Sequence, residues 1–223
     1  MATTDVDICN LALFRVRAKE IGSLLERSAQ AEKCRIFYPQ ARDSVLSSVD
    51  WSFAKTVKTL QLKSEKPQEW LYGYGEPIDS LKILYLLPAE SSENESIYTA
   101  SQSIYGTQEK PVIQFEMLTG DNGQSVIATN QATARVAYTK AVTDVRLFGA
   151  LCVEAISWKL AIDLAIPLGG DAGKSYRDDA KVAYRENLDI ADAQLKNQAQ
   201  NRLRQQTPRA VQARSGIRSS YSR

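Results

Sequence analysis

LCVEAISWKLAIDLAI, residues 151–166, decides the fold, because its apolar side chains point in nearly every direction around a helix. Its four polar residues fall on two narrow lines, Lys159 with Asp163 and Glu154 with Ser157. Two broad apolar faces remain, so this helix requires neighbours on both sides. With 16 residues and polar groups on every turn, it is too short for a membrane span, which takes roughly 20 mostly apolar residues. The pattern predicts the central helix of a soluble bundle.

Helical periodicity also marks the start of the chain. A capping box at Thr4 predicts a helix over about 5–18, with apolar residues at steps of three and four. A second helix is expected after the cap Ser28, as far as Asp50, with a kink or a break at Pro39.

Two helical stretches are expected after the middle of the chain. The pattern returns after Thr139, runs through the central helix and stops at the reversal 167–170 (PLGG). The last helix starts at Asp171 or Ser175 and carries an apolar stripe as far as Leu203.

The middle third alternates apolar and polar residues and predicts β-strands with a hairpin turn at 120–123 (GDNG). The fold expected is α+β: an antiparallel bundle of about four helices (1–56 and 140–204), an inserted antiparallel β region (57–139) and a flexible basic C-terminal arm (205–223). The candidate strands are 57–62, 81–87, 97–99, 112–117, 125–128 and 134–138.

Charge is distributed unevenly along the 223 residues, although the formal net charge is only +2. Residues 193–223 carry seven Lys or Arg and no acid, which leaves 21 basic against 26 acidic groups before them. A basic end is usually solvated, and less often an arm that docks on nucleic acid or on an acidic partner.

Few residues are suited to catalysis or metal binding. Cys9, Cys34 and Cys152 are widely spaced inside apolar helical patterns, so reduced thiols are expected rather than disulfides. Without histidine, imidazole chemistry is excluded, and a zinc site would need the three scattered thiolates. No cofactor, metal site or catalytic residue is predicted. No secretion signal is expected at the acidic amino terminus, which indicates folding in a reducing cytoplasm.

Two motifs resemble binding sites. Residues 169–175 (GGDAGKS) end like a phosphate-binding loop, but Leu168 stands where that motif needs glycine, so a helix hairpin is favoured. The aromatic residues Trp70, Tyr72 and Tyr74 lie among more acidic than basic neighbours, which favours aromatic packing or a protein contact over a platform for bases. From its residues alone, the sequence indicates an α+β scaffold and interaction protein.

Short segments spread over most of the chain form a recognisable set. They are 8–13 (ICNLAL), 31–43 (AEKCRIFYPQARD), 51–54 (WSFA), 70–74 (WLYGY) with Pro77, 81–85 (LKILY), 127–130 (IATN), 138–139 (YT) and 164–171 (LAIPLGGD). Taken together in their order and spacing, these segments resemble the tail tubular protein A family. The chain departs from that family at 14–17 (FRVR), where a small, glycine-containing turn is more usual.

The resemblance implies a structural virion protein without enzymatic activity, the head-to-tail adaptor of a short-tailed bacteriophage. Such a protein is made in the host cytoplasm and forms a ring, expected to be a dodecamer, between the portal protein and a tail nozzle similar to tail tubular protein B. Double-stranded DNA passes through the ring, and no membrane is involved. Trp70, Tyr72 and Tyr74 are the expected nozzle or subunit contacts.

The C-terminal arm is the expected portal-docking segment, because apolar anchors alternate with arginines along it. Two other classes stay open: a DNA-binding protein that uses the basic arm, and a hydrolase, which the absence of histidine disfavours. The expected docking residues are Leu203, Arg209, Val211, Arg214, Ile217, Arg218 and Tyr221.

Overall fold

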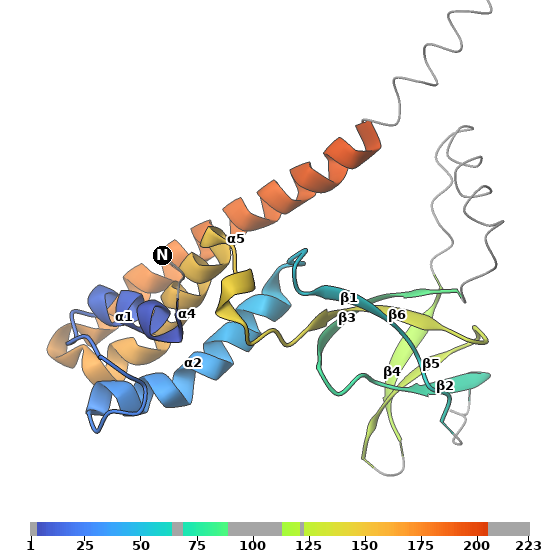
Figure 1. Cartoon of the computed structure of the whole chain (residues 1–223), viewed down its shortest axis with the longest axis horizontal. Helices are drawn as coiled ribbons and strands as arrows, with labels where there is room; N and C mark the ends of the chain where they lie inside the picture. The colour runs from blue at the N-terminus through green and yellow to red at the C-terminus, as the bar shows by residue number, and fades with distance from the viewer. Residues whose placement is uncertain (1–3, 64–68, 89–112, 121–122, 205–223) are drawn as a thin grey trace, which may run out of the picture. The chain divides into compact units, whose positions relative to one another are not determined.

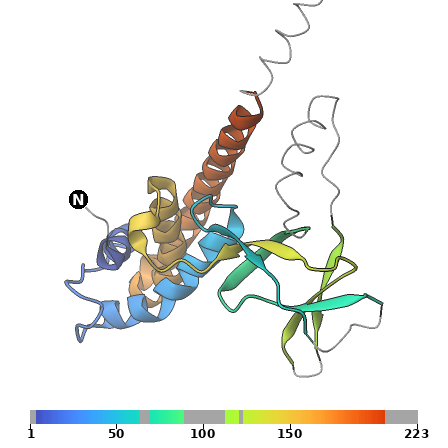
Figure 2. The same cartoon turned by 45° about the vertical axis from the view of Figure 1, so that its right-hand side comes forward.

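A computed structural model describes residues 4–63, 69–88, 113–120 and 123–204 of the chain (Figure 1, and turned about the vertical axis in Figure 2). Within these residues the α+β class is confirmed, with four α-helices and two three-stranded antiparallel sheets. The chain divides into two compact units: Met1–Lys55 with Thr139–Lys196, and Thr56–Tyr138 with Asn197–Arg223. The predicted strand at 97–99 and the whole arm 205–223 lie outside the described residues.

Helix α1 (Asp5–Arg15) begins at the predicted capping box, in which Thr4 and Asp7 bond each other's backbone N–H groups. It ends three residues earlier than predicted, because Arg17 turns the chain with a positive φ of 55°. The Ala18 N–H reaches the Leu13 carbonyl and the Arg17 N–H reaches the Phe14 carbonyl. These two bonds form a Schellman motif, whose left-handed residue is most often glycine. Arg17 therefore occupies the position that is most often glycine in such a turn.

Helix α2 (Ala29–Ser48) starts after Ser28, whose hydroxyl accepts the Ala31 N–H, as predicted. A kink or a break into two shorter helices was predicted at Pro39, and the break is wrong, because the helix stays continuous through this residue. Pro39 is exposed, so water can satisfy the carbonyl group that loses its helical partner. After the helix, the buried Trp51 donates its indole N–H to the Val45 carbonyl at 3.0 Å.

Helix α4 (Ala150–Leu168) contains the predicted central stretch, and both α1 and α2 pack against it. The helix begins later than predicted, because residues 135–140 continue a strand and a 3₁₀ turn (Val145–Leu147) follows. It also runs past Ile166 to include Pro167 in its last turn. Its fully buried residues face both neighbours: Cys152, Ala155, Ile156, Ser157, Leu160, Ala161, Leu164 and Ala165.

Glycines join α4 to α5 (Gly173–Arg204) through a short 3₁₀ turn (Gly170–Ala172). A Cβ at Gly169 or Gly173 would lie 2.4 or 2.5 Å from the Ala165 carbonyl oxygen, so both positions exclude a side chain. The phosphate-loop-like segment is thus a tight helix hairpin, as favoured from its spacing. Within α5, Ala180, Asn187 and Ala191 are buried.

The second unit consists of two small sheets. In the first, with strand order β1-β6-β3, β1 is Lys55–Thr59, β3 is Ser80–Leu87 and β6 is Arg135–Lys140. In the second, β5 (Ser125–Thr129) lies between β2 (Tyr72–Gly75) and β4 (Phe115–Thr119).

The hairpin predicted at 120–123 joins β4 to β5, and Gly123 has a positive φ of 71°. Strand β2 was not predicted, because its YGYG sequence alternates tyrosine with glycine rather than with β-branched residues. Side chains from both sheets form one apolar cluster: Leu60, Tyr74, Leu86, Ile127, Ala134, Val136 and Tyr138.

Candidate interaction surfaces

The three predicted aromatic contact residues lie on or beside β2, at different depths. Tyr74 is only 2% exposed and donates its hydroxyl to the Gln131 carbonyl at 2.9 Å. Tyr72 stacks on it at 6.4 Å between ring centroids and is partly buried. Trp70 donates its indole N–H to the Glu116 carboxylate at 3.1 Å. Tyr74 thus offers almost no surface to a partner, whereas Trp70 and Tyr72 remain partly accessible.

Of the predicted portal-docking residues, only Leu203 falls within the described part of the chain, in the last turn of α5. Arg209, Val211, Arg214, Ile217, Arg218 and Tyr221 lie outside the described residues. Their assignment remains a prediction.

Two buried titratable groups in the described residues have pKa values raised by their surroundings. Tyr38 is 4% exposed and its hydroxyl donates to the Asp5 carboxylate at 2.6 Å, so burial and this bond raise the pKa of Tyr38. Burial raises the pKa of Cys152 to about 12, so its thiol stays protonated near neutral pH. Over the described ranges, no cluster of three His, Cys, Asp or Glu residues could hold a metal ion. No helix in those ranges is both long and apolar enough to cross a membrane.

One arginine holds the end of α1 on α4. The Arg15 guanidinium pairs with the Glu154 carboxylate, bonds the Ser157 hydroxyl and lies 3.5 Å from the centre of the Trp158 ring. Burial lowers the pKa of Arg15, and the negative charge of Glu154 opposes that shift. This cluster uses the polar line of Glu154 and Ser157 that the sequence places on the central helix. It fixes the position of the residues on either side of Arg15.

The exposed residues at the end of α1 and in the turn after it include apolar and basic side chains. We define Leu11, Phe14, Arg17 and Lys19 as the α1-end patch. Phe14 is 81% exposed and Leu11 42% exposed. Phe14 and Arg17 also line a hollow of about 520 Å³ with Arg15 and Ala18. The Arg17 guanidinium lies 5.6 Å from the centre of the Tyr176 ring at the start of α5. The helical pattern predicts an outward face for α1, but not the turn that places Arg17 beside Phe14.

Helix α5 presents an exposed strip along the side opposite its buried residues. This α5 outer face is defined as Asp178, Asp179, Val182, Glu186, Asp189 and Ile190, all of them exposed. Val182 is 56% and Ile190 is 51% exposed, although both are aliphatic. Of its four carboxylates, only Asp178 has an ion-pair partner within the described residues, at 3.2 Å from Lys181 and 3.7 Å from Arg177. Arg185 is exposed on the same side, so the face carries four carboxylates against one arginine and is acidic with two apolar points.

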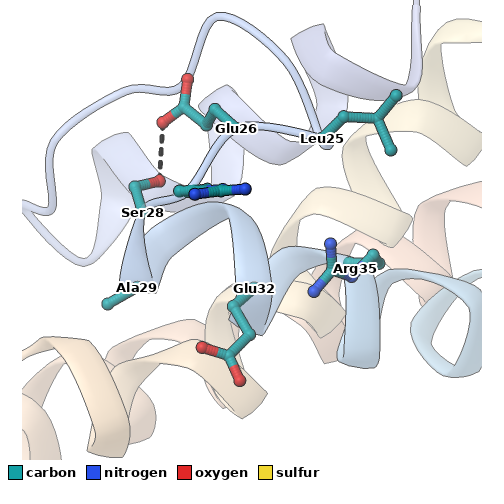
Figure 3. A pocket seen from close by; sticks show the side chains of 7 residues that line it. Leu25, Glu26, Ser28, Ala29, Glu32 and Arg35 are labelled. Carbon is teal, nitrogen blue, oxygen red and sulfur yellow. Dashed lines mark hydrogen bonds between the residues drawn. The ribbon is translucent and has the colours of Figure 1, made fainter.

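A second hollow of about 520 Å³ lies at the start of α2 (Figure 3). Figure 3 shows the Glu26 carboxylate accepting the Ser28 hydroxyl, at 2.6 Å. That bond, and the Gly22 N–H, lower the pKa of Glu26. Because Glu26 and Glu32 offset Arg27 and Arg35 around the hollow, it favours neither an anion nor a cation.

The sequence matches no protein-family model, and a search of curated proteins finds no match either.

Proposed function

We propose that this chain is a structural virion protein, a head-to-tail adaptor similar to tail tubular protein A. Its copies form a ring, a dodecamer in this proposal, which connects the portal protein to the tail nozzle and lines the channel for double-stranded DNA. In the same proposal the helices close as an antiparallel bundle around the inserted β region, and residues 205–223 form a flexible basic arm. The protein functions without cofactor or catalytic site.

The observation that carries the proposal is that the family-like segments coincide with the residues that build both units. In the helical unit, Ile8 and Leu13 are fully buried and Trp51 is 5% exposed. Segment 164–171 forms the end of α4 and the turn into α5. In the β unit, segment 127–130 covers the buried end of the central strand β5. The segments that resemble the family are therefore also segments that build the core and the turns, which supports the proposal of a shared fold.

A second feature supports a scaffold role. Large apolar side chains are exposed on both units, and several of them are more than half exposed. Single exposed apolar residues are common on any surface. Groups of them beside aromatic and arginine residues are typical of protein interfaces. The exposed apolar residues are Phe14, Leu25, Val182 and Ile190 in the helical unit, and Leu62, Leu71 and Ile78 in the β unit.

The test is to mix the purified full-length protein with portal rings of the same phage and to examine the particles by electron microscopy. The proposal predicts an added ring of density below the portal. The DNA-binding alternative predicts no added ring, and an affinity for any duplex that falls steeply with salt. Portals that stay bare at saturating protein would overturn the adaptor function.

A further inference from the structure

We propose that the α1-end patch of one copy docks on the α5 outer face of a second copy, in a head-to-tail contact between helical units. This contact rests on the proposed function, in which copies of the chain associate in a ring, and it names the two surfaces through which neighbouring copies bind.

The α5 outer face has the charge and the exposed apolar side chains of a docking surface for a basic segment. Asp179, Glu186 and Asp189 have no ion-pair partner within the described residues. They flank Val182 and Ile190, whose side chains are about half exposed. An acidic rim around apolar points fits a basic partner with an apolar anchor.

The α1-end patch supplies that chemistry. Phe14 is the most exposed aromatic residue in the described chain, at 81%. Arg17 lines the same hollow as Phe14 and is exposed and cationic, as is Lys19 two residues further along the chain. Aromatic residues and arginines carry most of the binding energy in protein interfaces. The patch and the α5 outer face are thus complementary in charge and in apolar content.

The patch is also held in place before any contact forms. Arg15, one residue from Phe14, is fixed to α4 through Glu154, Ser157 and Trp158. Arg17 adopts a left-handed backbone that is unfavourable for an L-residue, and its guanidinium lies over Tyr176. A preorganised patch loses less conformational entropy on binding.

Both surfaces belong to the helical unit, and they are made by different residues. A contact between two different surfaces of the same protein is heterologous, so a bound pair of copies still offers one free surface of each kind. Repetition of such a contact produces a closed ring or an open filament. A second copy of this chain is therefore the partner to which we assign the α5 outer face.

The test uses photo-crosslinking in the full-length protein. Phe14 is replaced with p-benzoylphenylalanine, the protein is irradiated with and without portal rings, and crosslinked peptides are identified by mass spectrometry. The expected crosslinks join position 14 to residues 178–190 of another copy. The matched control places the same group at Leu25, which is 83% exposed and outside the patch; it should give no crosslinks to those residues.

A charge exchange tests the electrostatic part. Arg17→Glu and Glu186→Arg should each weaken self-association about tenfold in sedimentation analysis, and the combined variant should regain most of the loss. Lys58→Glu is a matched control, because Lys58 is exposed on β1, in the other unit and outside both surfaces; it should change association much less.

The outcomes separate this contact from the adaptor function. Rings that form on portals while position 14 crosslinks elsewhere, or not at all, overturn the contact and leave the adaptor function standing. Crosslinks to 178–190 in free protein that never binds portals support the contact and overturn the adaptor function. Protein with neither rings nor crosslinks overturns both.

Discussion

At the scale of single residues, Arg17 shows how one backbone angle connects stability to surface chemistry. Its φ of 55° suits glycine, and the conformation is unfavourable by roughly 1 to 2 kcal/mol for an L-residue. Arg17→Gly should therefore raise the free energy of unfolding by about 0.5 to 1 kcal/mol, since added freedom in the unfolded chain offsets part of the gain. Denaturant melts measure the change. Arg17→Ala keeps the unfavourable angle and is the control; an equal gain for both would contradict this explanation.

Trp158 tests the packing of the central helix at the same scale. The side chain is partly buried, and the Arg15 guanidinium covers its ring at 3.5 Å. Trp158→Ala should lower the free energy of unfolding by about 3 kcal/mol, through lost apolar burial and a lost cation–π contact. Trp158→Phe keeps a ring and should lose less. A loss under about 1 kcal/mol for alanine would show that this residue does not hold α1 on α4.

At the scale of elements, the hairpin between α4 and α5 depends on the absence of a side chain. A Cβ at Gly173 would lie 2.5 Å from the Ala165 carbonyl oxygen and 3.4 Å from the Ile166 Cα. Gly173→Ala should destabilise the helical unit by about 1 to 3 kcal/mol, because the helices must move apart. Gly22→Ala is the matched control, since its nearest atom is a carboxylate oxygen at 3.8 Å. Thermal melts that show equal effects would rule out the steric explanation.

The β unit has its own pH-dependent element. The buried Tyr138 hydroxyl donates to the Asp79 carboxylate at 2.9 Å, and burial followed by this bond raises the pKa of Tyr138 to about 12 from its ordinary 10.0. The protonated phenol is favoured in the folded state, so its contribution to stability is full below pH 10.0 and is lost through about pH 12.

Tyr138→Phe removes that contribution. The stability difference between the native protein and this variant should stay constant below pH 10.0 and shrink as pH rises towards about 12. Denaturant melts over this pH range measure it. A stability difference that grows as the pH rises above 10.0 would contradict a stabilising role for the protonated phenol.

The sequence predicts elements well where one rule dominates. Continuous apolar periodicity locates α4, and side-chain caps locate the starts of α1 and α2. The failures occur where tertiary context decides between local rules. Strand β2 exists because the neighbouring strand β5 pairs with it along Tyr72–Gly75. Pro39 and Pro167 remain within helices because both are exposed, so water can satisfy the backbone carbonyl groups that lose their helical partners.

At the scale of the whole molecule, the candidate surfaces were only partly predictable. The aromatic run at 70–74 was visible in the sequence, but the burial of Tyr74 depends on a long-range bond to Gln131. The α1-end patch combines an outward helical position with a left-handed turn, and periodicity reveals only the first. The acidic side of α5 could have been found by plotting its residues around a helix. Which side of α5 is buried depends on how the helix packs against the rest of the helical unit, and the sequence of α5 alone does not give that packing.

The basic charge of the C-terminal arm has two possible roles, binding to DNA and docking on the portal, and they predict different effects of mutation. If it binds DNA phosphates, charge alone matters, so exchanging Arg209, Arg214 and Arg218 for lysine preserves binding, and affinity falls with salt in proportion to the phosphates contacted. If it docks on the portal, the apolar residues Val211 and Ile217 act as anchors and their removal weakens docking.

We favour docking, since a DNA-binding arm has no need of apolar residues at wide spacing. Deletion of residues 205–223 should leave the thermal unfolding temperature nearly unchanged, because every buried residue among those described precedes Asn197. The same deletion should abolish co-assembly with portal rings in electron micrographs, whereas the lysine exchanges should have a small effect. Complete rings on portals from the truncated protein would eliminate docking by the arm and favour DNA contact instead.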